Sequence, residues 1–532
     1  GGQLRARMAR GRTWHAAAVV AVLLLCCAYG ADAEAEAVAR PNFVLFLADD
    51  LGWGDVGFHG NPTIRTANLD RMAARGMRFT NCYAGESICS PSRAALMTGR
   101  LPIRTGVFTS WSYPNDNLVR VFYPWSTGSL PASEVTLANL VKPQGYGTAL
   151  VGKWHLGHVD AMPTHRGFDH FLGLPYSQDE GCPPGYGMNC TKEWERIWPG
   201  VPLYRNDTIS QQPVNLQTVV EKYTAQAEWF IEHSYNRSEP FVLVVAYDEV
   251  HIPLFASEKF TGASKRGLFG DALMELDYSV GRIVSKLEEL GLDENTLMMF
   301  TSDNGPWVAQ RTDGGNNGQF KGEKGTTFEG GVRMPTVAYW PGKIAAGSVN
   351  TDMASLMDIF PTVAELTGSP MPTDRVLDGV SLLPAMLEGG QVARECYFFY
   401  RSKYLQAARC GAYKAHFITR CGFCKEPPVY HEPPLLYNVH HDPAERFPLD
   451  AGQYAAQLAL IADAVAVHNA TVVPTQAQLE RLSVFVAPCC DRATGCQCGH
   501  PTTTDLPKGW QPRPPLAADD ITIRFKNYLS SH

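Results

Sequence analysis

Apolar runs alternate with amphipathic segments over the first two thirds of the chain. Four continuous apolar runs have the length of strands buried on both faces of a sheet. These four runs cover residues 42–48, 148–152, 241–247 and 297–301, and a fifth run follows at residues 335–340. Helical patterns lie between or after them, at residues 67–75, 89–97, 134–141, 216–233, 271–290 and 354–366. This alternation predicts an α/β fold with a large, mostly parallel sheet flanked by helices on both faces.

The pattern changes near residue 380. Short strand patterns at 396–400, 413–418 and 435–439 follow one another without long helices, which predicts an antiparallel sheet in a smaller C-terminal domain. A final helix is expected at about 454–469. We therefore expect a catalytic domain over 34–380 and a C-terminal subdomain over 381–532. Residues 156–214 are rich in Gly, Pro and Tyr, and we interpret them as an excursion that carries pocket walls.

The N-terminal segment has the features of a secretory signal peptide. Basic residues after Met8 precede an apolar run at 16–28 and a cleavage pattern at Ala31-Asp32-Ala33. Residues 1–33 are thus predicted to be leader and signal peptide, with a mature chain from about Glu34. A retained signal anchor is the alternative. No later apolar run is long enough to cross a membrane, so no membrane span is expected in the mature chain.

Composition agrees with a secretory protein. Four N-x-[ST] sequons predict glycosylation at Asn189, Asn206, Asn236 and Asn469. Of 14 cysteines, two leave with the signal peptide, and an oxidising compartment favours disulfides over zinc for the rest. Candidates are a local pair, Cys182 with Cys190, and a C-terminal cluster of Cys489, Cys490, Cys496 and Cys498. The net charge of −7, without a long basic run, argues against a nucleic-acid partner.

Oxygen-bearing side chains follow two of the predicted strands. Asp49 and Asp50 end the first strand, and Asp303 and Asn304 follow the strand at 297–301. Because parallel strands end at one edge of a sheet, these four can converge there. Carboxylate and amide oxygens suit a hard divalent cation, calcium more than magnesium. Taken as isolated pairs, the same residues could equally be caps or turns.

The stretch from Cys89 to Arg100 combines a nucleophile with an anion site. Good helix formers after Pro91 place Cys89 at a helix N-terminus, and Arg93 lies one turn further on. Free N–H groups at such an end attract a tetrahedral oxyanion. The alternative is that Cys89 forms a disulfide with Cys82, seven residues upstream.

The motif Cys89-Ser-Pro-Ser-Arg93, followed by a helix and Thr98-Gly-Arg, resembles the first signature of the type I sulfatase family. Gly152-Lys-Trp-His-Leu-Gly-His158 is similar to the second signature, and the resemblance extends over residues 41–498. It implies an alkaline-phosphatase-like fold and an enzyme that hydrolyses sulfate esters. It also implies that a formylglycine-generating enzyme converts Cys89 to formylglycine (3-oxoalanine), which leaves an odd number of cysteines.

The resemblance assigns roles to individual residues. One Ca²⁺ is expected on Asp49, Asp50, Asp303, Asn304 and the modified Cys89. A catalytic set is expected from Cys89, Arg93, Lys153, His155, His251 and Lys324, of which Lys153, His251 and Lys324 also bind substrate. Lys324 is preferred over the nearby Lys321, and Ser177 is similar to a substrate-contacting serine of arylsulfatase A.

The implied mechanism uses hydrated formylglycine. One hydroxyl attacks sulfur while Arg93 holds it, and His251 with Lys324 assists the departing alcohol. His155, helped by Lys153, then draws the proton from the second hydroxyl, so that sulfate is expelled. A thiol has no second hydroxyl.

Segments of the chain are similar to arylsulfatases A and G and to N-acetylgalactosamine-6-sulfatase. These imply, respectively, sulfated galactolipid, 3-sulfated glucosamine of heparan sulfate, and 6-sulfated galactosamine or galactose as substrates. The family favours a lysosomal location, with secretion as the alternative, and is compatible with a homodimer. Two other functions stay open: a phosphoester hydrolase of the same fold, and an inactive secreted binding or matrix protein.

Overall fold

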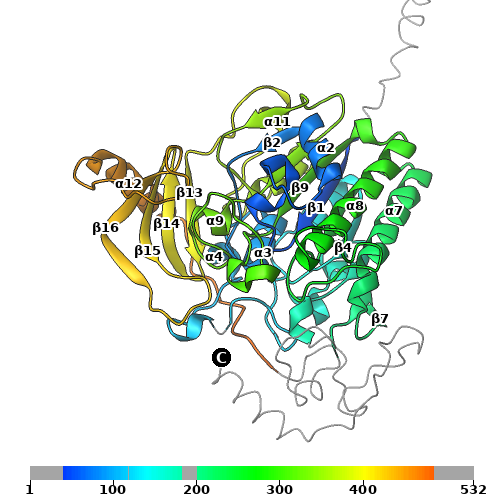
Figure 1. Cartoon of the computed structure of the whole chain (residues 1–532), viewed down its shortest axis with the longest axis horizontal. Helices are drawn as coiled ribbons and strands as arrows, with labels where there is room; N and C mark the ends of the chain where they lie inside the picture. Colours follow the sequence, from blue (N-terminus) through cyan, green and yellow to red (C-terminus); the bar gives the residue numbers. More distant parts are fainter. Residues whose placement is uncertain (1–39, 118, 182–199, 484–532) are drawn as a thin grey trace, which may run out of the picture. The chain divides into compact units, whose positions relative to one another are not determined.

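The computed structural model describes residues 40–117, 119–181 and 200–483, and its largest element is a ten-stranded sheet (Figure 1). The strand order is β11-β2-β10-β9-β1-β8-β4-β5-β6-β7. The strands are β1 Asn42–Ala48, β2 Met77–Phe79, β4 Gly147–Gly152, β5 His170–Gly173, β6 Leu203–Arg205, β7 Thr208–Gln211, β8 Phe241–Ala246, β9 Thr296–Ser302, β10 Thr336–Tyr339 and β11 Ser348–Asn350.

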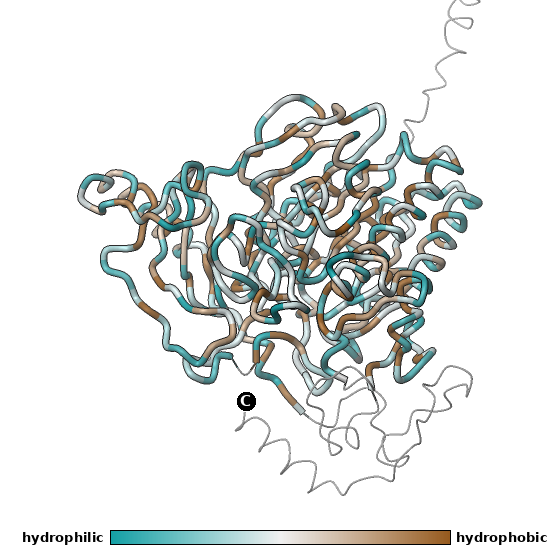
Figure 2. Tube along the Cα trace, viewed as in Figure 1, coloured by the Kyte–Doolittle hydropathy of each residue, from teal (hydrophilic) through white to brown (hydrophobic). Residues whose placement is uncertain are grey.

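The centre of this sheet is parallel and buried on both sides. Strands β9, β1, β8, β4 and β5 are parallel neighbours, whereas β10 pairs antiparallel with β9, and β6 with β5. Alternate residues of β1 enter different cores: Val44 and Phe46 one, Phe43 and Leu45 the other. This explains the continuous apolar run and the hydrophobic centre in Figure 2. The predicted fold class is confirmed.

Helices cover both faces of the sheet. One face packs against α2 Ala67–Arg75, α7 Val219–Asn236 and α8 Leu268–Glu289, and α7 and α8 lie side by side in Figure 1. The other packs against α3 Cys89–Thr98, α5 Leu137–Val141 and α10 Ile359–Thr367. Shorter helices are α4 Pro102–Thr105, α9 Glu329–Val332 and α11 Leu383–Leu387. In the described residues, no helix combines the length and apolar character that a membrane crossing needs.

A four-stranded antiparallel sheet forms the smaller C-terminal part. It contains β13 Cys396–Arg401, β14 Tyr404–Cys410, β15 Tyr413–Thr419 and β16 Val429–Asn438, and α12 Ala455–Ala470 packs against it. A disulfide joins Cys396 to Cys410 across β13 and β14. The pattern did not predict β14, because its buried Gln406 and Arg409 are polar. Residues 382–392 contribute to the large core, and the exact domain division stays a prediction.

The segment 156–214 also differs from expectation. We interpret it from the sequence as an excursion that carries pocket walls, and the structure shows that β5, β6 and β7 within it extend the main sheet. These strands have three or four residues each and several exposed side chains, so their sequences show no clear alternation of apolar and polar residues. The remaining short strands, β3 Cys82–Tyr83 and β12 Ala354–Ser355, pair in parallel. The signal peptide, Asn189 and the predicted disulfides at 182–190 and 489–498 lie outside the described residues.

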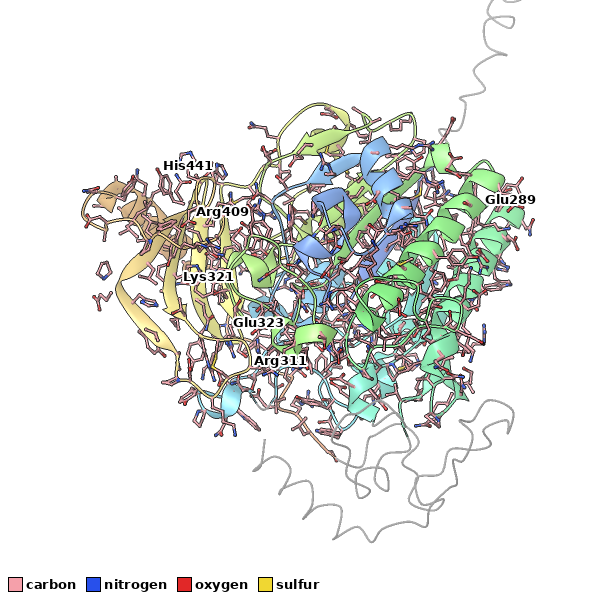
Figure 3. All side chains as sticks on the ribbon, in the orientation of Figure 1. Glu289, Arg311, Lys321, Glu323, Arg409 and His441 are labelled. Atoms are coloured by element: carbon pink, nitrogen blue, oxygen red, sulfur yellow. A yellow bond between two sulfur atoms is a disulfide. The ribbon has the colours of Figure 1, made fainter. Side chains whose placement is uncertain are left out.

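A group of buried charges joins the four-stranded sheet to the large part. We call Tyr83, Glu329, Arg333, Lys414, His416 and Glu445 the junction cluster. Glu329 accepts hydrogen bonds from Lys414 Nζ (2.8 Å), Arg333 Nη1 (3.1 Å) and the Tyr83 hydroxyl (2.8 Å). Glu445 accepts from the Glu329 N–H (2.7 Å) and pairs with His416 Nε2 (2.6 Å). Arg409, labelled on this sheet in Figure 3, also contacts Tyr83.

Candidate active site

The acidic residues predicted at the strand ends do converge. Ala48 of β1 and Ser302 of β9 are paired in register, so Asp49 and Asp50 lie beside Asp303 and Asn304. The Asp50 N–H contacts Asp303 Oδ1 at 3.3 Å, and Asn304 Nδ2 donates to Asp50 Oδ1 at 2.7 Å. All four residues are buried. Asp50 has a φ of 58°, which is unusual for a residue with a Cβ and is held here by these contacts.

Cys89 is the first residue of α3, and every residue of that helix is buried. Its N-cap, Ile88, provides no side-chain cap, so the helix N-terminus faces the site with its own N–H groups. Cys89 Sγ lies 3.5 Å from Asp49 Oδ1. Cys82 and Cys89 are both free, so the alternative disulfide between them is not formed.

Three cations face the three carboxylates. Arg93 Nε donates to Asp303 Oδ2 at 2.9 Å, and its Nη2 lies 3.6 Å from Asp49 Oδ2. Lys153 Nζ pairs with Asp49 Oδ2 and lies 3.7 Å from Cys89 Sγ. Lys324 Nζ donates to Asp50 Oδ2 at 2.8 Å. Together with Cys89, these six residues form what we call the catalytic cluster.

Burial and neighbouring charges perturb this cluster. Burial, together with the Asp49 carboxylate, raises the pKa of the Cys89 thiol well above its ordinary value, so an unmodified thiol there is a poor nucleophile. Burial also raises the pKa of Asp303, to about 7, with Asp49 adding to the effect. For Asp49, burial acts in the same direction, but Lys153, His251 and Arg93 outweigh it and hold its pKa well below the usual range.

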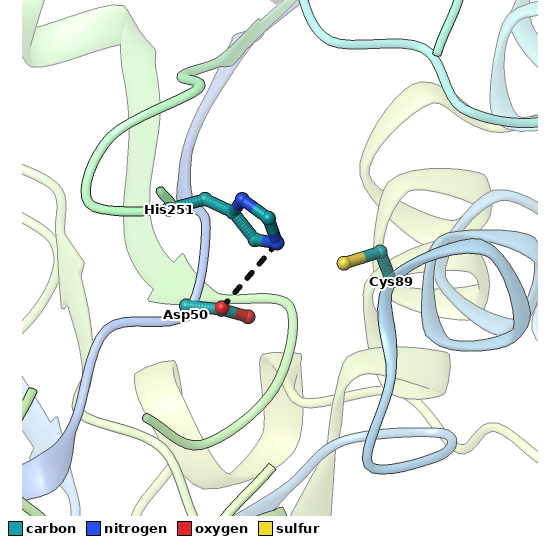
Figure 4. Close-up of side chains that lie close together, drawn as sticks. All are labelled: Asp50, Cys89 and His251. Carbon is teal, nitrogen blue, oxygen red and sulfur yellow. Dashed lines mark ion pairs between the residues drawn. The ribbon is translucent and has the colours of Figure 1, made fainter. Parts of the chain in front are cut away.

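Two histidines lie beside the cluster. His251 Nε2 is 3.6 Å from Asp50 Oδ2 (Figure 4). Its Nδ1 is 2.5 Å from the Ile252 carbonyl. His155 Nε2 is 2.9 Å from the Phe122 carbonyl. Because a carbonyl only accepts, the proton lies on His155 Nε2 and leaves Nδ1 with a lone pair. Burial, with Lys153 and Arg93, lowers the His155 pKa well below 6.5, which keeps the ring neutral.

Three further residues support the site and were not predicted. Gln178 Nε2 donates to the Asp248 and His251 carbonyls, at 3.0 Å each, and so fixes the backbone around His251. Glu180 Oε1 lies 3.5 Å from His155 Nε2. Asp248 lies two residues after the end of β8, near the same edge as Asp49 after β1, so the strand-end argument could have found it. Ser177 does lie at the site, where its hydroxyl accepts from Lys153 Nζ at 3.0 Å.

The donor set fits a hard divalent cation. Asp49, Cys89 and Asp303 bring their ligand atoms within 4.8 Å of one another, as do Asp50, Cys89 and His251. Asn304 Oδ1 is buried and has no hydrogen-bond partner among the described residues. An unpaired amide oxygen beside three carboxylates is the arrangement that calcium coordination uses.

Comparison with known families and structures agrees with this geometry. The family model described as sulfatase matches residues 41–369, and the model of the C-terminal region of aryl-sulfatase matches residues 392–498. N-acetylgalactosamine-6-sulfatase of Mus musculus is 40% identical over 89% of this chain and 95% of that protein. Arylsulfatase A of Homo sapiens is 42% identical over 78% of this chain and 85% of that protein.

A solved structure supports the same assignment. The PsFucS1 sulfatase from Pseudoalteromonas sp. superposes with a TM-score of 0.75 at 30% identity, covering 85% of this chain and 93% of that one. Both the large sheet and the four-stranded sheet lie within regions that the two family models match. This chain therefore belongs to the sulfatase family, whose members hydrolyse sulfate esters.

Proposed function

We propose that this chain hydrolyses sulfate monoesters of sugars in glycolipids or glycosaminoglycans, with Cys89 converted to formylglycine and one Ca²⁺ bound. The observation that carries the proposal is the position of Cys89. It lies at a buried helix N-terminus between three carboxylates and three cations. The raised pKa of its thiol argues that the unmodified residue is not the nucleophile.

Oxygen donors of Asp49, Asp50, Asp303 and Asn304, with residue 89, would hold the cation. Bound calcium supplies Lewis-acid polarisation and neutralises charge on the sulfate oxygens. Hydrated formylglycine supplies two hydroxyl groups, one for attack on sulfur and one for release of sulfate. Lys153 and Lys324 can contact sulfate oxygens, because their Nζ atoms point into the cluster. Arg93, which donates to Asp303, would hold the attacking hydroxyl of residue 89.

The two histidines are suited to opposite proton transfers. His155 Nδ1 has no hydrogen-bond partner among the described residues, and its lowered pKa keeps it available as a base. His251 Nε2, with Lys324 nearby on Asp50, can protonate or neutralise the departing alcohol. Ser177, which bonds Lys153, would help to position the sulfate group.

Maturation in the secretory pathway follows from the same proposal. Formylglycine formation requires a separate modifying enzyme, and the relatives are consistent with a secretory or lysosomal protein. Asn206, Asn236 and Asn469 are all exposed, so each sequon could carry a glycan. We propose lysosomal delivery, with export as the alternative destination.

The proposal is tested first by mass spectrometry of protein from its native secretory pathway. In the tryptic peptide of residues 79–93, residue 89 should carry an aldehyde, with the sulfur and two hydrogens lost and one oxygen gained, and Cys82 should keep its thiol. An intact thiol or a cystine at residue 89 in protein that still releases sulfate would overturn it.

Turnover is then measured on sulfated galactolipid, 3-sulfated glucosamine, 6-sulfated N-acetylgalactosamine and 6-sulfated galactose, with an aryl phosphate as comparison. We expect calcium-dependent release of sulfate from at least one sugar. Faster release of phosphate would favour the phosphoester hydrolase. Absence of all turnover by modified, calcium-loaded protein would favour an inactive binding protein.

A further inference from the structure

An aromatic pair stands at the edge of the catalytic cluster. Trp307 comes four residues after Asp303, and Phe423 lies in the loop between β15 and β16 of the C-terminal sheet. Their ring centroids are 4.5 Å apart, with an interplanar angle of 32°. Trp307 is half-buried and Phe423 is 37% exposed. The Arg120 guanidinium lies over the Phe423 ring, 5.4 Å from its centroid, so a ligand can contact the part of that ring which stays exposed.

Trp307 reaches both residues assigned to the leaving group. Lys324 Nζ lies 5.0 Å from the Trp307 ring centroid, and the His251 ring centroid lies 6.0 Å from it. Both Lys324 and His251 also face Asp50. The ring therefore borders the side of the site where the departing alcohol must lie, rather than the side of Arg93 and Lys153.

The loop that carries Phe423 is held rigidly. A disulfide joins Cys421 to Cys424. Arg401 donates to the Cys421 and Gly422 carbonyls at 2.7 Å and 3.0 Å, and Arg120 donates to the latter at 3.2 Å.

This loop also touches the backbone of the large part. A Cβ on Gly422 would come within 2.4 Å of the Lys324 carbonyl oxygen, so the two segments are in direct contact. Phe423 is thus fixed before any ligand arrives, which lowers the entropic cost of binding.

We propose that Trp307 and Phe423 form an aromatic platform that binds the pyranose ring of the sulfated sugar. The proposal rests on the sulfatase function above and adds residues that select its substrate. A pyranose has an apolar face of C–H bonds, which are slightly positive, and the face of an aromatic ring is slightly negative. A sugar stacked on this platform would direct its sulfate group toward the catalytic cluster and keep its hydroxyl groups in contact with solvent.

Kinetics of Phe423→Ala test the platform. On the monosaccharide sulfate that wild type cleaves best, we expect KM to rise about tenfold, with kcat changed by less than about threefold, because the ring acts in binding. Phe423→Tyr should restore most of the affinity. The inhibition constant for inorganic sulfate should stay unchanged, since sulfate alone does not reach the platform. Phe447→Ala, which removes a ring that is 73% exposed elsewhere in the C-terminal part, is the matched control.

Several results would overturn the platform: an unchanged KM in Phe423→Ala, an equal rise in Phe447→Ala, or a parallel loss of affinity for inorganic sulfate. The last would mean that Phe423 only supports Lys324. A separate readout is saturation-transfer NMR of galactose, N-acetylgalactosamine and glucosamine. We expect wild type to bind at least one of them and Phe423→Ala to bind it more weakly.

This binding measurement does not depend on turnover. If wild type binds a sugar through Phe423 but releases no sulfate, the proposed sulfatase function is wrong and the proposed aromatic platform is supported. If it releases sulfate and none of the three sugars shows Phe423-dependent binding, the platform alone fails.

Discussion

The catalytic cluster and the junction cluster are both buried groups of charges, yet they are arranged differently. Around Glu329, burial acts to raise the pKa, but Lys414, Arg333 and Arg409 outweigh it and hold that pKa well below 4.5. Around Asp303, burial and Asp49 prevail, and the pKa rises to about 7. Cations thus outweigh burial at Glu329, whereas at Asp303 they do not, even though they hold the pKa of the neighbouring Asp49 down.

The unpaired atoms point the same way. At the catalytic site, Asn304 Oδ1, Arg93 Nη2 and His155 Nδ1 have no hydrogen-bond partner in the described part of the chain. In the junction cluster, the same is true of one buried side-chain atom among the described residues, His416 Nδ1. Buried polar atoms normally have partners. We infer that the junction cluster stabilises the fold and that the catalytic cluster is completed by a cation and a substrate.

The largest expected effect is at residue 89. Cys89→Ala and Cys89→Ser should each lower kcat on the order of a thousandfold or more, because neither offers the thiol that the formylglycine-generating enzyme converts. The melting temperature should change little, since both replacements are small. Cys82→Ala, the matched buried cysteine, should lower stability but keep turnover. Substantial sulfate release by either Cys89 variant would contradict the assignment of residue 89 as the nucleophile of the catalytic cluster.

Asp303→Asn should separate the two kinds of cluster. Removing one of three adjacent carboxylates relieves repulsion, so the calcium-free variant should be at least as stable as calcium-free wild type. The rise in melting temperature on adding calcium should largely disappear, and kcat should fall by about a hundredfold. Calorimetry with and without a chelator measures this. The exposed Asp463→Asn is the control, and a calcium response retained by Asp303→Asn would count against the assigned ligand.

Glu329→Gln should have the opposite profile, with loss of stability and little loss of turnover per folded molecule. It leaves Arg333 without its counter-charge and Lys414 with Glu445 alone, 3.3 Å away, which should cost about 3 kcal/mol of unfolding free energy. A lowered pKa stabilises the fold when the carboxylate is ionised. The difference between wild type and variant should therefore be full above pH 4.5 and shrink as the pH falls below it. Urea titrations across that range give the answer, and a difference that grows at acid pH would be incompatible with this account.

The smallest effect is expected from Tyr83→Phe. The Tyr83 hydroxyl donates to Glu329 Oε2 at 2.8 Å and also contacts Arg409. Removing it should cost about 1 kcal/mol, the usual contribution of one buried hydrogen bond, and leave kcat unchanged. Tyr430→Phe, at a side chain that is 68% exposed, serves as the reference. Equal unfolding free energies for the two variants would mean that the junction bond contributes nothing.

The catalytic cluster could be predicted further than the junction cluster. Asp49 and Asp303 follow apolar runs, and parallel strands bring such ends together, so their meeting follows from sequence pattern. The preference for Lys324 over Lys321 comes from the resemblance alone. The structure directs Lys324 Nζ to Asp50 and places Lys321 Nζ 4.3 Å from the centroid of the Phe328 ring. The catalytic roles themselves stay predictions.

Long-range pairings without a periodic signal could not be predicted. Lys414 and Glu329 are far apart in the sequence, and nothing local to either indicates the other. The same holds for β14, whose buried Arg409 has its partners in other segments, and for Phe423 beside Trp307.

The burial of α3 has a consequence for when residue 89 can be altered. Cys89 is 2% exposed, and each of the nine residues that follow it in the helix is also buried. A second protein cannot reach that sulfur once the chain has closed around it. If formylglycine is made, it must be made during or soon after synthesis. Protein that is refolded from a denatured chain with an unconverted Cys89 would then regain the native fold but not the sulfatase activity.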